Sequence, residues 1–385
     1  MRRGRSALSG VWLAGAALVL AGCSTIENLN PFSSSGPKMA ELKPIQATAD
    51  ARVAWKQGVG KSGDYVFTPA VVGGAVYAAN SRGDVYRIEN GDVKWRVNAD
   101  MNLSGGVGSD GRRVVVGSPK GDVLAFDAND GKLLWKARVS SDILAAPAVD
   151  ASLVVVRSGD NRLYGFDASD GKRKWVYQRQ TPALSLRTFA APLIDNGFVF
   201  AGFPGGKLVA VTVNNGAQAW EGTVALPKGT TELDRVADIT SAPVVSGRMI
   251  CSVAYQGRIA CFDLTNGQLA WARDMSSSAG LTADGRYVYV SDDKGSVHAL
   301  DLASGASIWK QDKLFLRQLS APVARGRFVA VADIQGVLHV LNRDDGAFAA
   351  RLTTDGSPVT APLQTLDNKI LLQTRSGSVQ AIEIQ

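Results

Sequence analysis

Cysteine and histidine are scarce in this chain, which has three cysteines and two histidines among 385 residues. Charged residues make up 20% of the sequence, and there is no lysine and arginine run of the kind that binds nucleic acid. A metal centre needs several ligands at suitable spacing, and His298 and His339 lack further ligands of that kind. No nucleophile elbow, phosphate-binding loop or dinucleotide fingerprint stands in a suitable context. We therefore predict no catalytic residue, no metal, no cofactor and no nucleic-acid partner.

A hydrophobic run long enough to span a bilayer is also lacking near the start of the chain. The apolar stretch from Leu8 to Leu20 is about thirteen residues long and follows a basic segment. It ends in Leu20-Ala21-Gly22-Cys23, which resembles the lipobox of bacterial lipoproteins rather than an ordinary signal peptide with an incidental cysteine. The resemblance implies that residues 1–22 are a signal peptide and that Cys23 carries the lipid anchor. Because Ser24 follows, it also implies sorting to the outer membrane.

The next segment, residues 23–50, has the composition of a flexible tether. It contains Asn30-Pro31, Ser35-Gly36-Pro37 and Lys43-Pro44, and no apolar period persists through it. Removal of residues 1–22 takes away three arginines and lowers the formal net charge from +7 to +4. We expect the folded domain to occupy residues 51–385.

A ladder of tryptophans indicates an internal repeat. Seven of the eight tryptophans follow one another at steps of 38 to 51 residues. They are Trp55, Trp95, Trp135, Trp175, Trp220, Trp271 and Trp309. We expect each to be a structural residue that packs between repeats, with the ring buried and the indole N–H satisfied nearby.

Each tryptophan closes a longer pattern, seen most clearly from Gly121 through Asp127 and Gly131 to Trp135. A small residue followed by proline, such as Ala146-Pro147, marks most copies upstream, and eight copies can be counted. Each copy contains about 40 residues and short strand-like runs separated by turns, which is the size of a propeller blade. The sequence therefore predicts an all-β fold, an eight-bladed β-propeller of four-stranded antiparallel blades.

The ends of the repeat array predict how the ring closes. The eighth copy reaches Gln385 without a tryptophan strand of its own, and Trp55 belongs to a strand with no blade before it. We expect Arg52–Lys56 to be the outer strand of the last blade, so that an N-terminal strand closes the propeller.

Three kinds of repeated polar or reactive residue have structural interpretations. The two histidines share one slot of consecutive copies and should be tolerated in a semi-buried position. The aspartates that precede the turn glycines should accept hydrogen bonds from turn amides; they are Asp127, Asp167, Asp263 and Asp301. Cys251 and Cys261 flank a hairpin turn and should face each other, either as a disulfide or as two buried thiols.

The pattern from Ala125 to Trp135 resembles the repeat of the PQQ-type propellers, which include quinoprotein dehydrogenases. Those enzymes are usually longer and carry an adjacent cysteine pair, which this chain does not have. Lipobox, tether, eight copies and length together are similar to the BamB family, lipoproteins of the β-barrel assembly (BAM) machinery. That resemblance implies a non-enzymatic scaffold on the periplasmic face of the outer membrane. A periplasmic quinoprotein and a propeller for another envelope ligand remain the alternatives.

Two segments carry the family resemblance in more detail. Leu184-Ser185-Leu186-Arg187 and Glu232–Asp238 look like the two loops with which that family contacts the POTRA domains of BamA. The resemblance implies that Leu184, Leu186, Arg187 and Asp238 bind BamA. Through BamA it implies contact with the other BAM subunits and with nascent β-barrel proteins. Thr240 stands where the family often has a second acidic residue. Both segments also lie in the two longest gaps of the tryptophan ladder, where a propeller carries functional loops.

Overall fold

Eight four-stranded antiparallel sheets make up the part of the chain that the computed structural model describes, residues 37–385. The signal peptide and Cys23 predicted from the sequence lie outside the described residues. Blade 1 contains β2 (Ala70–Val72), β3 (Ala75–Ala79), β4 (Asp84–Glu89) and β5 (Asp92–Asn98). Blade 2 contains β6 (Gly108–Ser109), β7 (Arg113–Gly117), β8 (Asp122–Asp127) and β9 (Leu133–Arg138). Blade 3 contains β10 (Ala148–Val149), β11 (Leu153–Arg157), β12 (Leu163–Asp167) and β13 (Arg173–Tyr177).

The remaining five sheets follow the same plan. Blade 4 contains β14 (Leu193–Asp195), β15 (Phe198–Phe203), β16 (Lys207–Thr212) and β17 (Gln218–Thr223). Blade 5 contains β18 (Val244–Ser246), β19 (Met249–Val253), β20 (Arg258–Asp263) and β21 (Leu269–Asp274). Blade 6 contains β22 (Gly280–Ala283), β23 (Tyr287–Ser291), β24 (Val297–Asp301) and β25 (Ser307–Gln311). Blade 7 contains β26 (Val323–Arg325), β27 (Phe328–Ala332), β28 (Val337–Asn342) and β29 (Phe348–Thr353). Blade 8 contains β30 (Gln364–Leu366), β31 (Lys369–Gln373), β32 (Ser378–Ile384) and β1 (Ala51–Gly58).

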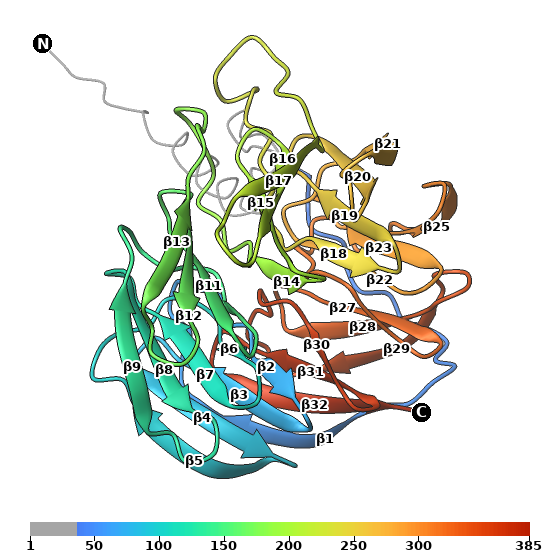
Figure 1. Ribbon diagram of the computed structural model, residues 1–385. Coiled ribbons are helices and arrows are strands. Elements are labelled where there is room, and N and C mark those ends of the chain that lie inside the picture. The colour runs from blue at the N-terminus through green and yellow to red at the C-terminus, as the bar shows by residue number, and fades with distance from the viewer. Residues whose placement is uncertain (1–36) are drawn as a thin grey trace, which may run out of the picture. The chain divides into compact units, whose positions relative to one another are not determined.

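The blades are arranged around a common axis within the unit Ala40–Gln385 (Figure 1). The short first strands lie innermost, since β2 contacts both β6 and β30, and β10 contacts both β6 and β14. The middle strands are buried on both faces, as in β3, β11 and β23, because blades pack face to face. The eight-bladed propeller predicted from the repeat is confirmed. None of residues 37–385 forms a helix with the length and apolar character that crossing a membrane requires.

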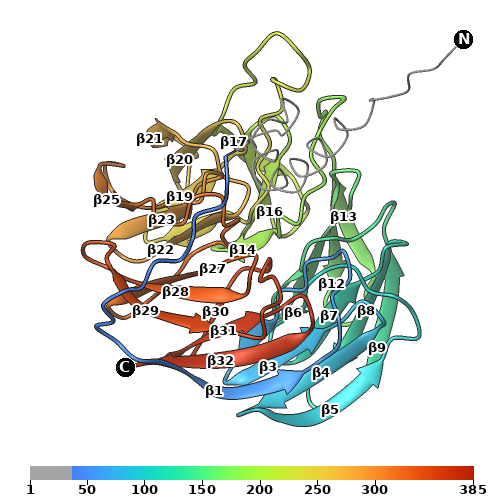
Figure 2. The same ribbon diagram turned by 180° about the vertical axis from the view of Figure 1, so that it is seen from behind.

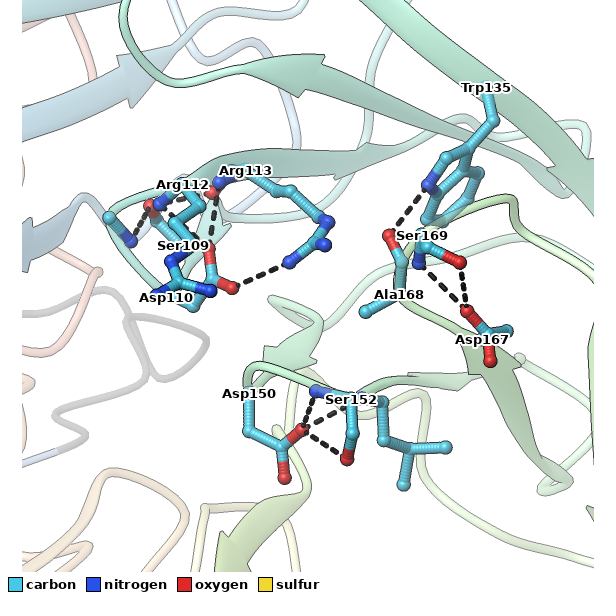
Figure 3. Close-up of polar contacts among 12 residues, drawn as sticks. Ser109, Asp110, Arg112, Arg113, Trp135, Asp150, Ser152, Asp167, Ala168 and Ser169 are labelled. Carbon is cyan, nitrogen blue, oxygen red and sulfur yellow. Dashed lines mark hydrogen bonds and ion pairs between the residues drawn. The ribbon is translucent and has the colours of Figure 1, made fainter.

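A repeated contact joins each blade to the next. The indole of Trp135 donates a 3.0 Å hydrogen bond from Nε1 to the carbonyl oxygen of Ala168, in the turn after β12 (Figure 3). Gly171 in the same turn has a φ of +72°, and a Cβ there would lie 2.6 Å from the Trp135 ring. Glycine is therefore required both for the backbone conformation and for the space that the indole occupies. The contact extends from one blade into its neighbour, which explains why tryptophan and glycine recur together.

The other tryptophans behave in the same way, with one exception. Six of the seven, all except Trp55 of the closing strand, donate the indole N–H to a carbonyl of the following blade. Five are buried, while Trp55 and Trp95 are half-buried. Within its own blade each tryptophan faces a residue of the neighbouring strand, usually a small one. The pairs include Trp135 with Ala125, Trp175 with Gly165, Trp271 with Cys261 and Trp309 with Ala299.

The strand β1 closes the ring as predicted. It pairs antiparallel with β32 and brings Trp55 opposite Ala381, the register that the tryptophan has in the other blades. The amide of Val59 donates to the carbonyl of Gly377 at 2.8 Å. The corresponding bond in blade 2, from Val139 to Gly121, is formed within one continuous segment. In blade 8, these bonds join the two ends of the described chain. In the other blades, the same bonds form within one continuous segment.

Ala350 occupies the tryptophan slot of blade 7, and the structure explains the substitution. Blade 8 has no turn at the corresponding place, because β32 and β1 belong to opposite ends of the described chain. The backbone amides of Thr48 and Ala49 lie there instead and both donate to the carbonyl of Ala349. Val340, larger than its small counterparts, stands opposite Ala350. An indole therefore has no turn to contact at this junction.

Residues 40–50 lie along the propeller, whereas the sequence predicted a flexible tether over 23–50. Figure 2 shows this segment in blue beside blades 6 and 7. The amide of Ala40 donates to Phe315, and Leu42 packs on the apolar cluster that contains Trp309. The guanidinium groups of Arg317 and Arg351 donate to the carbonyls of Ala40 and Lys43, each at 2.9 Å. Composition could not reveal these contacts because their partners are about 300 residues away.

The two histidines make polar contacts that the sequence did not indicate. His339 is fully buried and contacts Asp333 at 3.0 Å, and Arg317 binds the same carboxylate at 2.6 Å. His298 contacts Asp292 at 2.8 Å in the matching slot of blade 6. The slot is therefore more than a tolerated aromatic position, because each histidine holds an aspartate of the preceding turn.

The repeated aspartates and the cysteine pair are also located by the structure. Asp167 accepts a 2.9 Å bond from the amide of Ser169, as Figure 3 shows, and Asp127 binds the amide of Asn129. Cys251 and Cys261 face each other on β19 and β20 and form a disulfide, with 4.0 Å between their Cα atoms. Both cysteines are buried against Trp271, so this disulfide belongs to the core of blade 5.

Candidate functional site

Two long connections between blades form the most distinctive surface of the molecule. They run from β13 to β14 and from β17 to β18, and both protrude on the same side in Figure 1. They carry leucines that the core does not cover, with exposed fractions of 41% for Leu184, 57% for Leu226 and 71% for Leu233. Exposed apolar side chains on ordered loops are typical of protein-binding surfaces.

Asp238 connects the two loops from a buried position. Only 2% of it is exposed, and its Oδ2 accepts a 2.7 Å hydrogen bond from the amide of Leu186. Its Oδ1 accepts a 3.0 Å bond from the amide of Gly205 in the β15–β16 turn. The sequence predicted Asp238 as a residue that touches the partner, whereas this geometry makes it a residue that positions the loop around Leu186.

Thr188 and Thr240 add a second connection. The hydroxyl of Thr188 donates to the carbonyl of Thr240 at 3.1 Å, and the hydroxyl of Thr240 donates to Ser278 in the next connection at 3.2 Å. The residue that replaces an often acidic position of the family therefore joins neighbouring blades. These bonds attach the Leu184–Arg187 loop to the neighbouring connection.

Arg187 extends from this loop toward blade 3. Its side chain is 64% exposed and forms a 2.8 Å ion pair with Asp142, in the connection between β9 and β10. Leu186 is half-buried and faces the same region. Leu184, Leu186 and Arg187 thus lie on one loop with Asp238 beneath it, and their part in partner binding stays a prediction.

Arg157 is a residue of this site that the sequence reasoning missed. It ends β11, is 4% exposed, and donates to the carbonyl of Gly202 at 2.6 Å and to Asn161 at 3.0 Å. Burial lowers the pKa of its guanidinium to about 10, while the charge of Asp238 acts in the opposite direction. A signal was present, since the matching strands β7 and β19 end in the uncharged residues Gly117 and Val253.

The central channel allows a test of the quinone cofactor that PQQ-type propellers carry. A cavity of about 260 Å³ lies on the axis, and its walls are small or apolar residues with Ser, Thr and Gln as the polar groups. A tricarboxylate quinone and its cation would need charged partners there, and none of the lining residues is charged. No group of three or more His, Cys, Asp or Glu able to hold a metal ion occurs within residues 37–385. The residues present therefore do not fit this cofactor.

The fold and surface define a PQQ-like repeat propeller whose distinctive feature is a loop surface rather than a cofactor site. A family model described as "Outer membrane protein assembly factor BamB" matches residues 81–311. The Bordetella pertussis protein of that name is 43% identical over 94% of this chain and 95% of its own length. The chain belongs to the BamB family of outer membrane protein assembly factors. Its relatives are named as assembly factors and not as enzymes, consistent with a non-enzymatic protein.

Solved structures agree with this assignment. The crystal structure of BamB from Moraxella catarrhalis superposes with a TM-score of 0.81 and 29% identity, covering 87% of this chain and all of that one. Quinohemoprotein alcohol dehydrogenase from Comamonas testosteroni superposes with a TM-score of 0.68 and 15% identity, covering 86% of this chain and 76% of that one. The second similarity reflects the shared propeller fold alone.

Proposed function

We propose that this chain is a scaffold subunit of the BAM complex, which binds the POTRA domains of BamA and assists insertion of β-barrel proteins into the outer membrane. Family membership supports the assembly role. The resemblance of the Leu184–Arg187 loop supports the choice of BamA as partner. Contacts with other BAM subunits and with nascent barrels would follow from that complex.

We further propose that a lipid on Cys23 holds the protein at the periplasmic face of the outer membrane. The lipobox-like sequence before Cys23 and the serine after it support this location. Several acyl chains on one residue would provide essentially permanent attachment.

The observation that carries the proposed contact is the construction of the Leu184–Arg187 loop. Buried Asp238 fixes the Leu186 amide, and Leu184 remains 41% exposed on the fixed loop. A preordered apolar side chain loses little conformational entropy on binding, and such residues commonly anchor interfaces. Arg187 adds a cation beside this anchor that can bind a carboxylate through more than one N–H.

The test is a crosslinking pull-down from membranes. The triple variant Leu184→Ala, Leu186→Ala, Arg187→Ala is compared with wild type and with the control Leu133→Ala, Leu134→Ala, Arg138→Ala. The control removes the same residue types from the outer strand β9, where both leucines are 46% exposed. We expect wild type and control to recover BamA and the loop variant to lose it.

Other outcomes would have distinct meanings. Equal recovery of BamA by the loop variant would show that the partner is right and the interface lies elsewhere. Absence of BamA from the wild-type sample would overturn the proposed partner.

A further inference from the structure

A cavity of about 290 Å³ lies beside the Leu184–Arg187 loop, between the connections of blades 2, 3 and 4. Its lining includes Leu186 and Arg187 on one side, Asp142 and Leu144 on the other, and Arg157 with Asn161 at the end of blade 3. We call it the Arg157 cavity. The proposed binding loop is therefore one wall of a hollow.

Asp142 is held firmly at one side of this cavity. The hydroxyl of Ser141 donates to its Oδ1 at 2.9 Å, and its carbonyl oxygen accepts the amide of Gly159 at 2.8 Å. A Cβ on Gly159 would overlap the Asp142 carboxylate, so the missing side chain leaves space for it. The Asp142 carboxylate in turn fixes Nη2 of Arg187.

Arg157 supplies a second guanidinium, and this one is buried. Its hydrogen bonds go to an amide oxygen and a backbone carbonyl, and among the described residues it forms no ion pair with a carboxylate. Asp238 is the anion that acts on it through space, but both Asp238 oxygens are bound to backbone amides. A buried cation whose polar contacts are neutral gains strongly from a nearby anion.

The charges that line the cavity are therefore two guanidinium groups and one carboxylate. A guanidinium has five N–H donors in a fixed fork, so Arg187 can hold Asp142 and a second carboxylate together. The space beside it is large enough for a side chain, and Leu144 and Leu186 would contact the apolar part of that side chain. Charge complementarity favours an acidic side chain as the occupant.

We propose that the Arg157 cavity receives an acidic side chain of the partner domain, with Arg187 and Arg157 as its counter-charges. Asp142 is the positioning residue that holds Arg187 at the cavity. This inference rests on the proposed function, because it assigns the chemistry of one contact within that interface. It adds to the leucine anchor a charged contact that selects partners with a carboxylate at the matching position.

The experiment measures the affinity of the full-length protein for purified BamA POTRA domains by calorimetry at two salt concentrations. The key variant is Asp142→Asn, whose amide oxygen can still accept from Arg187 while its negative charge is gone. We expect binding to tighten by about threefold and to depend more steeply on salt, since a like charge has been removed from the rim. Asp170→Asn, in an exposed turn of blade 3, makes the same change in net charge away from the cavity and should leave affinity unchanged.

Two further measurements identify the contact. Arg187→Gln should abolish the gain produced by Asp142→Asn when the two are combined. Replacing acidic residues of the POTRA domains one at a time by their amides should reveal one position that also abolishes the gain. Unchanged or weaker binding by Asp142→Asn would overturn the cavity proposal. The proposed function would still stand if the wild type binds and the Leu184→Ala, Leu186→Ala, Arg187→Ala variant does not. Absence of wild-type binding would overturn both.

Discussion

The junction between blades 2 and 3 and the junction between blades 7 and 8 solve the same packing problem with different chemistry. At the first, the Trp135 indole enters the turn of the next blade, donates to Ala168 and occupies the space that Gly171 leaves. At the second, Ala350 replaces the indole, Val340 is larger, and residues 48 and 49 fill the place of the turn. The tryptophan is thus required by the turn it faces, and a repeat keeps it only where such a turn exists.

Charge distinguishes the other face of blade 7, which packs on blade 6, since His339 lies opposite Val331 of the apolar cluster shared with that blade. Blade 7 contains the buried group Arg317, Asp333 and His339, and Arg317 reaches the docked segment at Ala40. The junction between blades 2 and 3 relies on a neutral indole in an apolar cluster. The junction between blades 6 and 7 should therefore respond to pH differently from the junction between blades 2 and 3.

The largest expected effect comes from Trp135→Ala. Loss of a buried indole and its hydrogen bond should lower the free energy of unfolding by about 3–5 kcal/mol. Urea denaturation followed by circular dichroism would measure it, with Leu134→Ala on the same strand as an exposed control. A loss of less than about 1 kcal/mol would show that the indole is not the main contact of this junction.

A smaller loss of stability is expected from the reverse substitution at Ala350. Ala350→Trp introduces the residue that other blades use, yet it should destabilise the protein by about 1–3 kcal/mol because the site is already filled. Combining it with Val340→Ala should recover part of that loss. If Ala350→Trp stabilised the protein in the same denaturation assay, the docked segment would not exclude an indole as we infer.

The pH dependence should separate the junction of blades 6 and 7 from that of blades 2 and 3. Burial lowers the pKa of His339, so the unfolded chain, with a histidine pKa of about 6.5, binds a proton more readily than the folded protein does. Its contribution to stability is therefore present above about pH 6.5 and is lost as the pH falls below that value.

His339→Leu tests this, since Leu124 holds the matching slot in blade 2. The variant should flatten the decline of stability between about pH 7 and pH 5, by at most about 1.4 kcal/mol per pH unit. Thermal denaturation across that range would measure the slopes. Parallel curves for wild type and variant would contradict the assignment, and Trp135→Ala should lose a similar amount at both ends of the range.

The smallest expected effect on stability is at the loop surface. Leu184→Ala should change the free energy of unfolding by less than about 0.5 kcal/mol, because the side chain is 41% exposed and packs little. The same variant should weaken recovery of BamA in the pull-down. A large fall in the midpoint of denaturation would instead mean that Leu184 folds back onto the propeller.

The architecture could be predicted from the sequence because the same residue pattern recurs in most of the blades. The spacing of the tryptophans, the copy count and the surplus strand at Trp55 led to eight blades and to closure by β1, both of which the structure contains. Contacts within a blade recur every 40 residues or so, and a pattern seen several times can be interpreted with few assumptions.

Features that occur once were not predictable in the same way. Asp238 is joined to Leu186 across 52 residues, and Arg157 to Gly202 across 45. The Arg157 contact has a counterpart in Gln373 at the end of β31, which donates to Ala79 of the next blade, but the two residue types differ and so form no visible sequence pattern. The docking of residues 40–50 on blades 6 and 7 depends on separations of about 300 residues, so composition alone suggested a tether.

The closure of the ring has a consequence for the order of the chain. Asp50 and Gln385 are hydrogen bonded to each other in both directions, at 3.0 and 2.9 Å. A short linker between them would turn the folded domain into a circle, and opening that circle at an exposed turn elsewhere would give a circular permutant with the same eight blades. The attachment point of a membrane anchor could then be moved around the propeller without altering its core.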